Sequence, residues 1–424
     1  MQNMRNKAYQ LLRRSEDFFK TDMVYLAKGG FWFTLAQTVV SLSSFFLAVA
    51  FAHFVTKEAY GQYKYILSIV GLLGAFTLSG LPSAVLRSVS NGHDGTLVYA
   101  FWQNLKWNVL FFIVALALST YYFINGNSTL GISFLVVGSL WPIFQSTNLY
   151  NSYLLAKKDF KRSAMYFDVI GNLFPIFCLV ITMLVTTNPV WLVTSYLASN
   201  TVIGLILYRR VLKVYHPGES IDHGTLSYGK HLSLINILSG IAAYLDQILV
   251  FHYIGAVELA IYNFAVAIPN QTKGPLKGLR NLMFPKFMER TDKEIELGNN
   301  RKFVLLFFLG LGLSLTYIAI APLIFRIFFP NYLDAVFYSQ IFSLSLINIT
   351  FFPADVYLAA RKKIKEQYLA SISTSIIQII TVIVSIIYWG LLGLILARVI
   401  VRILSSFISF IIFRNTIKRA IISQ

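Results

Sequence analysis

Residues 302–326 read KFVLLFFLGLGLSLTYIAIAPLIFR, with a basic residue at each end and no charged residue between them. A helix of about 20 consecutive apolar residues is long enough to cross the hydrocarbon core of a bilayer. The stretch does not alternate polar and apolar residues, as a strand of a membrane β-barrel would. It therefore predicts a transmembrane α-helix, in which the backbone satisfies its own hydrogen bonds.

Apolar runs of similar length fill the rest of the chain and are joined by short loops. Of the 424 residues, 56% are hydrophobic and only 13% are charged, whereas soluble proteins carry roughly 25% charged residues. These features predict an all-α polytopic membrane protein of about twelve transmembrane helices, with no loop long enough for a soluble catalytic domain. The predicted spans are residues 29–55, 62–87, 98–124, 130–156, 164–187, 190–212, 229–254, 261–287, 302–326, 337–360, 367–388 and 392–413.

Basic residues gather in every second loop, and this asymmetry sets the orientation in the membrane. The intervening loops are nearly bare and hold only Lys57 and Arg326. Because the alternation keeps its phase over an even number of spans, both termini are predicted to be cytoplasmic. The basic segments contain Arg13, Arg14, Lys20 and Lys28; Lys157, Lys158, Lys161 and Arg162; Arg209, Arg210 and Lys213; Lys286, Arg290, Lys293, Arg301 and Lys302; Arg361, Lys362, Lys363 and Lys365; and Arg414, Lys418 and Arg419.

The formal net charge of +18 comes from 36 Lys and Arg residues against 18 Asp and Glu residues. Nucleic-acid binding does not explain it, because the basic residues are dispersed between apolar spans and form no polar face. The single cysteine, Cys178, excludes a disulfide within the chain and a thiolate metal site. There is no HExxH or GxxxxGK[ST] motif. We therefore expect no nucleic-acid partner, no metal and no cofactor.

An internal repeat relates the two halves of the chain. A shift of 199 residues aligns His53 with His252 and Tyr63 with Tyr262, and a shift of 204 aligns residues 153–158 with 357–362. Six spans separate equivalent points, so the sequence predicts two parallel six-helix lobes, as in transporters that bind substrate between their halves. The predicted units are an N-terminal cytoplasmic amphipathic segment 1–28, a first lobe 29–213, a cytoplasmic linker 214–228, a second lobe 229–413 and a cytoplasmic tail 414–424.

Three cations lie inside the eighth predicted span. Lys273, Lys277 and Arg280 are spaced i, i+4 and i+7, which places them on one helix face. A Lys or Arg at the bilayer centre costs at least about 2.5–3.5 kcal/mol, so three of them would cost roughly 8–10 kcal/mol in contact with lipid. This face is therefore predicted to line a hydrated cavity that binds an anionic substrate.

Further charged residues within the spans extend this prediction. Arg398 and Arg402 form an i, i+4 pair and are expected to line the same cavity, unless Arg398 pairs with a carboxylate or extends toward the interface. Lys64 and Lys106 either line the cavity or extend to the interface, since both lie nearer helix ends. Asp246 is an isolated intramembrane carboxylate, suited either to ion coupling or to balancing a cation.

Arg87 and Lys286 occupy equivalent positions at the predicted cytoplasmic ends of their helices. Basic residues at such ends commonly anchor a helix at the membrane surface. The alternative is that these two residues form a cytoplasmic gate between the lobes.

Several short motifs resemble one known family. They are EAYGQY at 58–63, SGLP at 79–82, YLDQIL at 244–249 and IYN at 261–263. In their order and spacing they resemble the Wzx-type (O-antigen) polysaccharide flippases of the multidrug/oligosaccharidyl-lipid/polysaccharide (MOP) exporter superfamily. The resemblance implies a V-shaped, MATE-like pair of lobes with alternating access and no enzymatic activity.

The resemblance also implies a substrate, a location and partners. The substrate would be an undecaprenyl-diphosphate-linked oligosaccharide, moved across the bacterial inner membrane for O-antigen, lipopolysaccharide or other cell-surface polysaccharide. Partners would be membrane lipids, a polymerase and other polysaccharide-assembly proteins. Because the sequence has no GxxxxGK[ST] nucleotide-binding motif, we expect a proton or sodium gradient to supply the energy. The cationic lumen of the family corresponds here to Lys273, Lys277 and Arg280, together with Arg398 and Arg402.

Other classes of membrane protein are less consistent with the sequence. A MATE-like multidrug or cation antiporter is expected to carry acidic residues in its cavity, whereas this chain carries basic ones. A polysaccharide polymerase should have a long periplasmic loop, and a glycosyltransferase a soluble domain or DxD motif. A scaffold without transport activity would not explain cations inside the membrane.

Overall fold

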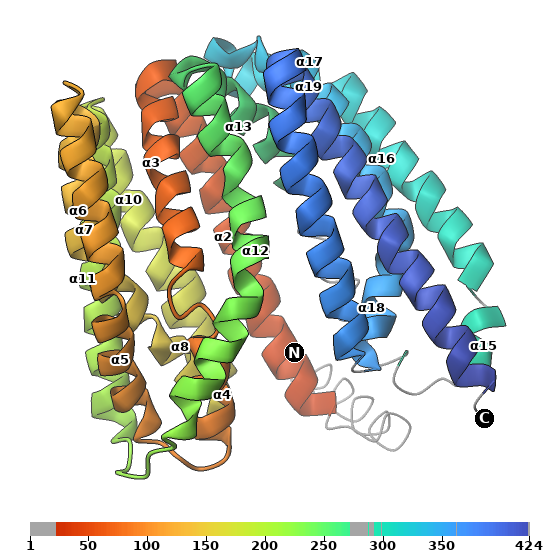
Figure 1. Cartoon of the computed structure of the whole chain (residues 1–424), viewed down its shortest axis with the longest axis horizontal. Helices are drawn as coiled ribbons and strands as arrows, with labels where there is room; N and C mark the ends of the chain where they lie inside the picture. Colours follow the sequence, from red (N-terminus) through yellow and green to blue (C-terminus); the bar gives the residue numbers. More distant parts are fainter. Residues whose placement is uncertain (1–22, 272–286, 288–291, 298, 362, 423–424) are drawn as a thin grey trace, which may run out of the picture.

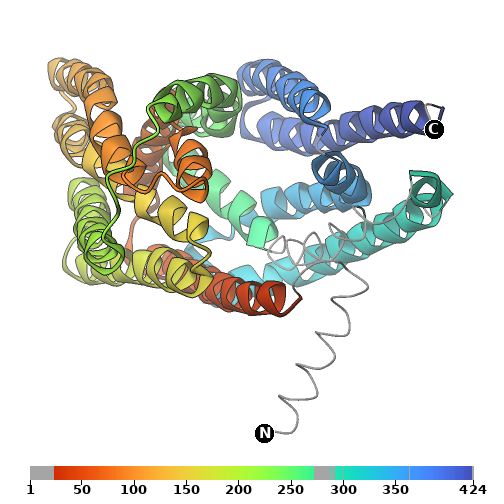
Figure 2. The same cartoon turned by 90° about the horizontal axis from the view of Figure 1, so that it is seen from below.

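The computed structural model describes residues 23–271, 287, 292–297, 299–361 and 363–422. These residues are helical almost throughout and contain no β-strand. Most of the predicted amphipathic segment 1–28 lies outside the described residues. The predicted all-α architecture is confirmed, and Figures 1 and 2 show its arrangement.

The first half of the chain places its six predicted spans on helices, several of which are interrupted. The second span, for example, is unwound between α3 and α4 at Phe76–Gly80. The elements are α2 (Met23–Phe54), α3 (Lys57–Ala75), α4 (Leu81–Ser90), α5 (Thr96–Trp107), α6 (Val109–Ile124), α7 (Ser128–Thr147), α8 (Leu149–Ala156), α9 (Phe160–Ser163), the π-helix η1 (Ala164–Ile170), α10 (Gly171–Val185) and α11 (Pro189–Tyr215).

The second half repeats this plan. Its last two predicted spans lie on α19, which consists of two helical arms joined by a kink at Gly390, where φ is 58° and ψ is −142°. A positive φ of this kind favours glycine, because it has no Cβ. The elements are α12 (Gly224–Tyr253), α13 (Ala256–Gln271), α15 (Asp292–Leu297), α16 (Asn299–Phe328), the 3₁₀ helix η2 (Pro330–Tyr332), α17 (Ala335–Ser343), the 3₁₀ helix η3 (Leu344–Phe351), α18 (Phe352–Ala360) and α19 (Ile364–Ile422).

Among the described residues, nine helical segments are long and apolar enough to cross a membrane, and one of them, Lys365–Arg419, contains two predicted spans. The predicted spans at 62–87 and 261–287 are not among the nine. The first begins with α3, which carries three charged residues and packs against α7, α11, α12 and α13. A helix surrounded by other helices need not be as apolar as one that faces lipid.

The helix ends follow the predicted repeat. Helix α2 ends at Phe54 and α12 at Tyr253, which are 199 residues apart. Helix α8 ends at Ala156 and α18 at Ala360, which are 204 residues apart. The two halves therefore share helix boundaries as well as the sequence matches that suggested the repeat.

The helices form two groups that meet at one end and diverge toward the other (Figure 1). Helices α2 to α11 lie in one group and α16 to α19 in the other. Helix α12 packs against α3 and α4 of the first half and also against α19 of the second. It therefore joins the two predicted lobes, and the lobe boundaries derived from the sequence stay a prediction.

At the meeting end, which we call the closed end, aromatic side chains from both halves are in contact. The ring of Tyr60 lies 5.1 Å from that of Phe264, measured between centroids. Helices α3 and α13 approach so closely here that a Cβ added to Gly61 would collide with the backbone carbonyl group of Ala256. A single apolar core runs through both groups at this end.

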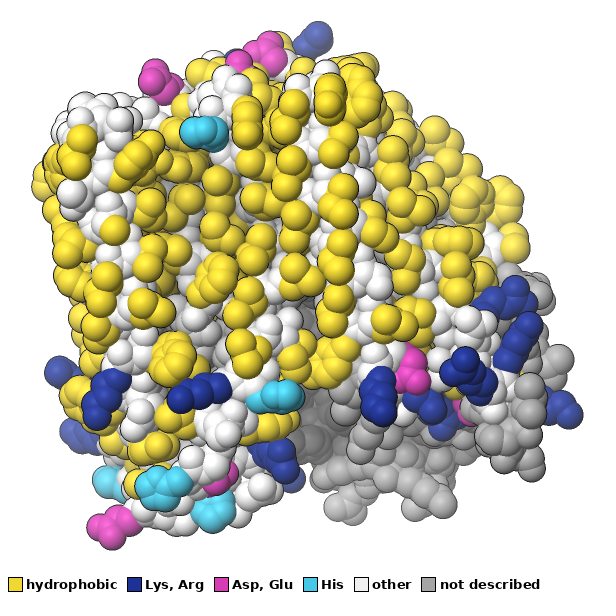
Figure 3. All heavy atoms as spheres, in the orientation of Figure 1, with side chains coloured by type: hydrophobic (Ala, Val, Ile, Leu, Met, Phe, Trp, Pro, Cys, Tyr) yellow, Lys and Arg dark blue, Asp and Glu magenta, His cyan; other side chains and the backbone are white. Residues whose placement is uncertain are grey.

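The diverging end, which we call the basic end, carries most of the Lys and Arg side chains visible in Figure 3, below a broad apolar band. The loops predicted to be basic thus gather at one end of the bundle. Their described residues include Lys157, Arg162, Arg209, Lys213, Arg361, Lys365, Arg414 and Lys418.

Candidate functional site

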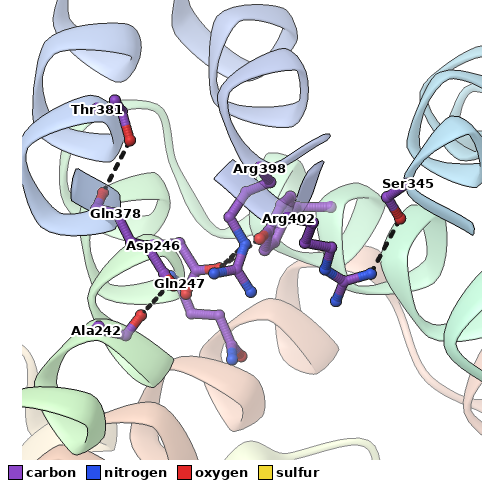
Figure 4. Close-up of polar contacts among 9 residues, drawn as sticks. Ala242, Asp246, Gln247, Ser345, Gln378, Thr381, Arg398 and Arg402 are labelled. Atoms are coloured by element: carbon purple, nitrogen blue, oxygen red, sulfur yellow. Dashed lines mark hydrogen bonds and ion pairs between the residues drawn. The ribbon is translucent and has the colours of Figure 1, made fainter. Parts of the chain in front are cut away.

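Asp246 lies in the last third of α12, seven residues before the helix ends at Tyr253, and is buried, with 2% of its surface exposed. Its Oδ2 atom accepts a hydrogen bond from the hydroxyl of Tyr262 on α13 and lies 3.3 Å from Nε of Arg398 on α19. Its Oδ1 atom accepts a hydrogen bond of 2.9 Å from the backbone N–H of Gln247. Figure 4 shows the Asp246 and Arg398 side chains pointing toward one another. The structure therefore supports the counter-charge role considered for Asp246.

Arg402 lies one helical turn after Arg398 but points toward different partners (Figure 4). Its Nη1 atom donates a hydrogen bond of 3.1 Å to Oγ of Ser345, and its guanidinium carbon lies 4.4 Å from the ring centroid of Phe342. Among the described residues, no carboxylate lies within ion-pair distance of Arg402. In the part of the chain that the structure describes, a hydroxyl dipole and the face of an aromatic ring contact the guanidinium of Arg402.

The position of Ser345 depends on an irregular segment. It lies in η3, a 3₁₀ helix that separates α17 from α18 within one predicted span. A 3₁₀ segment has three residues per turn rather than 3.6, so it redirects the side chains that follow it. The interruption thereby presents a hydroxyl to Arg402 from the middle of the span.

A further contact ties α19 to α12 beside the ion pair. The side-chain amide of Gln378 donates a hydrogen bond to the carbonyl of Ala242, one turn before Asp246. On the same arm of α19, the hydroxyl of Thr381 donates a hydrogen bond of 3.1 Å to the backbone carbonyl of Gln378 (Figure 4). The cluster thus lies where α12, α13, η3 and both arms of α19 meet.

The charges in this cluster do not cancel. Its described residues include two guanidinium groups and one carboxylate, so together they carry a net charge of +1 when Tyr262 is neutral. Arg398 is 15% exposed at its side chain, and a charge so far removed from water is costly unless it is paired. An anion that approached Arg402 would be attracted by the surplus positive charge.

The other predicted site residues lie elsewhere. Lys64 is half-buried on α3, with Nζ 5.4 Å from the ring centroid of Tyr60. Lys106 is exposed on α5, and Arg87 is exposed on α4, with its guanidinium carbon 4.9 Å from the ring centroid of Tyr228. The structure brings Asp246, Arg398 and Arg402 together and does not bring these three to them. The predicted residues that lie outside the described residues are Lys273, Lys277, Arg280 and Lys286.

Three members of the cluster were not predicted from the sequence. Tyr262 was noticed as the repeat partner of Tyr63 and within the IYN motif but not as a site residue, and neither Ser345 nor Gln378 carries a charge that would mark it. Hydrophilic residues at mid-span are a weak signal, because Ser and Gln occur in many transmembrane helices without a ligand.

In the described ranges, no group of three or more His, Cys, Asp or Glu residues is placed so that it could hold a metal ion.

The fold is that of MOP superfamily transporters. An inward-facing multidrug resistance MATE family transporter aligns with a TM-score of 0.72 and 15% identity over 91% of this chain and 95% of that chain. An outward-facing MATE transporter aligns with a TM-score of 0.62 and 15% identity over 93% and 96%. A MOP superfamily transporter from Pyrococcus furiosus, described as having a binding pocket of reverse polarity, aligns with a TM-score of 0.64 and 15% identity over 93% and 96%.

The family described as "Polysaccharide biosynthesis protein" matches residues 26–272, which is more than half of the chain. The protein belongs to this family. No curated protein sequence matches it. The family and the fold together confirm the resemblance to MOP superfamily polysaccharide flippases and define a multi-pass membrane transporter.

Proposed function

We propose that the protein is a flippase that moves an undecaprenyl-diphosphate-linked oligosaccharide across the bacterial inner membrane for cell-surface polysaccharide assembly. The observation that carries this proposal is the surplus positive charge at Arg402. This residue lies inside the membrane, and among the described residues no carboxylate is within ion-pair distance of it. A diphosphate offers several anionic oxygens to a planar guanidinium, and such charge-assisted hydrogen bonds are strong.

The positions of the lobes support alternating access. The lobes meet at the closed end and diverge at the basic end, which is the cytoplasmic end according to the distribution of Lys and Arg. The structure then corresponds to an inward-facing state that receives substrate from the cytoplasmic leaflet. The diphosphate binds near Arg402, the oligosaccharide follows the hydrated space between the lobes, and the polyprenyl chain stays in lipid.

The energy for this movement comes from an ion gradient acting through the Asp246–Arg398 pair. Neutralising Asp246 frees Arg398 from its partner and adds a second unpaired cation to the cluster. The affinity for the diphosphate would then differ between the charged and the neutralised form of Asp246. Coupling requires such a difference in affinity between two states of the protein.

A multidrug antiporter is the second candidate, because two of the solved structures described above are multidrug transporters. Those drugs are commonly cationic, and a cationic substrate would be repelled by the surplus charge at Arg402. The charge of the cluster therefore favours the anionic substrate.

The test is translocation of a fluorescent undecaprenyl-diphosphate oligosaccharide in proteoliposomes that contain the purified protein. We expect Arg402→Ala to lower the initial rate at least tenfold and Arg402→Lys to restore part of it. The matched control is Arg326→Ala, which removes an exposed arginine at the end of α16. An inactive wild-type protein would overturn the proposed function, whereas an active Arg402→Ala variant at equal abundance would overturn only the role of Arg402.

A further inference from the structure

A group of cations lies at the basic end of the first half. It comprises Lys161 and Arg162 on α9 and Arg209, Arg210 and Lys213 in the last two turns of α11, and we call it the α9–α11 cluster. All of these side chains except Arg162 are exposed. Helices α10 and α11 lie on the side of the first group away from α16 to α19 (Figure 1). The cluster is therefore separate from the Asp246 site, which joins α12 to α19.

Most of the charge in the α9–α11 cluster is not balanced by carboxylates. Nη1 of Arg162 lies 3.0 Å from Oδ2 of Asp159 and donates a hydrogen bond of 2.9 Å to the hydroxyl of Tyr215. In the part of the chain that the structure describes, no carboxylate lies within ion-pair distance of the other four cations. The five cations and Asp159 together carry a net charge of +4. Such a surface attracts anions.

Two of these four cations lie over aromatic rings of neighbouring elements. The guanidinium carbon of Arg210 is 5.7 Å from the ring centroid of Tyr166 on η1, and Nζ of Lys161 is 5.1 Å from that of Trp32 on α2. The face of a ring attracts a cation without cancelling its charge. Because a ring offers no acceptor oxygen, the N–H groups of these cations remain able to donate hydrogen bonds to an anion.

The surface next to the cluster, toward the closed end, is apolar. Helix α10 packs against α11 and exposes Phe177, 64% of which is accessible, while α11 exposes 48% of Val202 and 53% of Ile206. Both helices belong to segments long and apolar enough to cross a membrane, so these side chains face lipid. Arg209 and Lys213 follow Ile206 by three and seven residues, which are positions on the same helix face. An apolar stripe on α11 thus ends in two cations.

This sequence of surfaces matches the shape and charge of a phospholipid. Its acyl chains fit along Phe177, Val202 and Ile206, and its phosphate then lies among the cations of α11. Charge-assisted hydrogen bonds from guanidinium groups to phosphate are strong. Basic sites between transmembrane helices at the cytoplasmic surface are typical of anionic lipid recognition. A zwitterionic head group carries its own cation, which the positive cluster repels.

The internal repeat does not require this cluster. The shift of 204 that relates residues 153–158 to 357–362, continued along the chain, aligns Arg162 with Glu366 and Tyr166 with Ala370. The second half therefore has a carboxylate in place of one cation and no ring where Tyr166 supports Arg210. The arrangement of cations and rings is particular to the first half.

We infer that the α9–α11 cluster, together with the exposed apolar faces of α10 and α11, binds an anionic phospholipid of the leaflet at the basic end. The head group contacts α9 and α11 at once and so joins two elements that are separated in sequence by η1 and α10. This site is distinct from the one proposed for the transported diphosphate and does not depend on it.

The test measures lipid binding to the purified full chain by native mass spectrometry, which counts the lipids bound to each protein. Phosphatidylglycerol is the anionic probe, and phosphatidylcholine is the zwitterionic comparison. We expect phosphatidylglycerol to bind at least tenfold more tightly. Lys161→Gln combined with Arg209→Gln and Arg210→Gln should weaken its binding at least fivefold, because contacts between cations and the phosphate are lost.

The matched control removes the same charge from the same end of the second half. It combines Lys365→Gln, Arg414→Gln and Lys418→Gln, whose native side chains are also exposed. We expect less than a twofold change in the affinity for phosphatidylglycerol. Equal losses in the two triple variants would overturn the inference, and so would equal affinities of the wild-type protein for the two lipids.

A pair of single variants tests the site without changing its charge. Tyr166→Leu removes the ring beneath Arg210 and should weaken binding of phosphatidylglycerol at least twofold, whereas Tyr166→Phe keeps the ring and should bind as the wild type does. Equal affinities of these two variants would overturn the placement of the head group between η1 and α11. The thermal midpoints of all variants are compared with that of the wild type to confirm folding.

A competition with inorganic phosphate separates a lipid site from a site for a free anion. We expect phosphate in large excess to leave phosphatidylglycerol bound, because the acyl chains contribute to the affinity. Displacement by phosphate alone would overturn the assignment to a lipid. None of these measurements requires transport, so they can succeed or fail whether or not the protein is a flippase.

Discussion

Nζ of Lys57 lies 2.6 Å from Oδ2 of Asp334, and the two residues belong to opposite halves of the chain. The pair lies at the closed end, beside a hydrogen bond of 2.9 Å from the side-chain amide of Asn331 to the carbonyl of Ala52. These polar contacts lie at the rim of the aromatic contacts between Tyr60 and Phe264. Opening the closed end, as alternating access requires, would break all of them.

Removing this ion pair should shift the conformational equilibrium toward a state in which the two halves are separated at the closed end. The side chains are 28% and 64% exposed, so we expect at most about 1 kcal/mol from the pair, or up to a roughly fivefold change in population. Spin labels at Phe54 and Leu333 should report longer distances in Lys57→Ala and in Asp334→Ala. The exchange Lys57→Asp with Asp334→Lys should return the distances toward wild type, and a lack of any shift in the single variants would show that the pair does not stabilise closure.

The Asp246–Arg398 pair should be costly to break from one side. Asp246→Asn leaves a buried arginine without its counter-charge, and such losses typically cost about 3–5 kcal/mol. Thermal unfolding in detergent should therefore show a clearly lower midpoint. Arg398→Met in addition should recover much of the loss, because it removes the unpaired charge, and a double variant no more stable than Asp246→Asn would contradict this account.

The close approach of α3 and α13 predicts a different response at two glycines. Gly61→Ala forces a Cβ against the backbone of Ala256, so we expect about 1–3 kcal/mol of destabilisation from overpacking. A Cβ added to Gly312, on α16, would meet no atom within 4 Å, and the residue has no positive φ. Gly312→Ala should therefore leave the free energy of unfolding unchanged or raise it by up to about 1 kcal/mol through helix propensity. Thermal unfolding of both variants compares them directly, and equal effects would be inconsistent with the packing described.

A pH-dependent contact lies at the basic end. Partial burial alone would raise the pKa of the Asp159 carboxyl, but hydrogen bonds from the Tyr215 hydroxyl and from the backbone N–H of Arg162, together with the charge of Arg162, lower the pKa below its ordinary value. A lowered pKa stabilises the folded state above the unfolded-state pKa of about 3.9 and loses that effect as the pH falls through the folded-state value.

Tyr215→Phe should therefore lower stability at neutral pH, and the difference from wild type should shrink below about pH 4. Chemical unfolding at a series of pH values measures this difference. A gap between the two proteins that is the same at pH 7 and pH 3 would mean that Tyr215 acts through packing and not through the Asp159 carboxylate.

Much of the fold follows from local properties of the sequence. Residues 302–326 form the central part of α16, and the basic loops gather at one end, because helix length, apolarity and loop charge each depend on residues close together in the chain. The 199-residue shift matches the ends of α2 and α12 for the same reason. The segment of the candidate site that the sequence marked most strongly, Lys273 to Arg280, lies outside the described residues.

The tertiary structure decided which of the remaining charged residues act together. Asp246 and Arg398 are 152 positions apart, and only the packing of α12 against α19 makes them partners. Arg402 meets Ser345 because η3 interrupts the predicted span at 337–360. Hydropathy places a residue at a depth in the membrane, but the rotation and packing of each helix determine which side chain it faces.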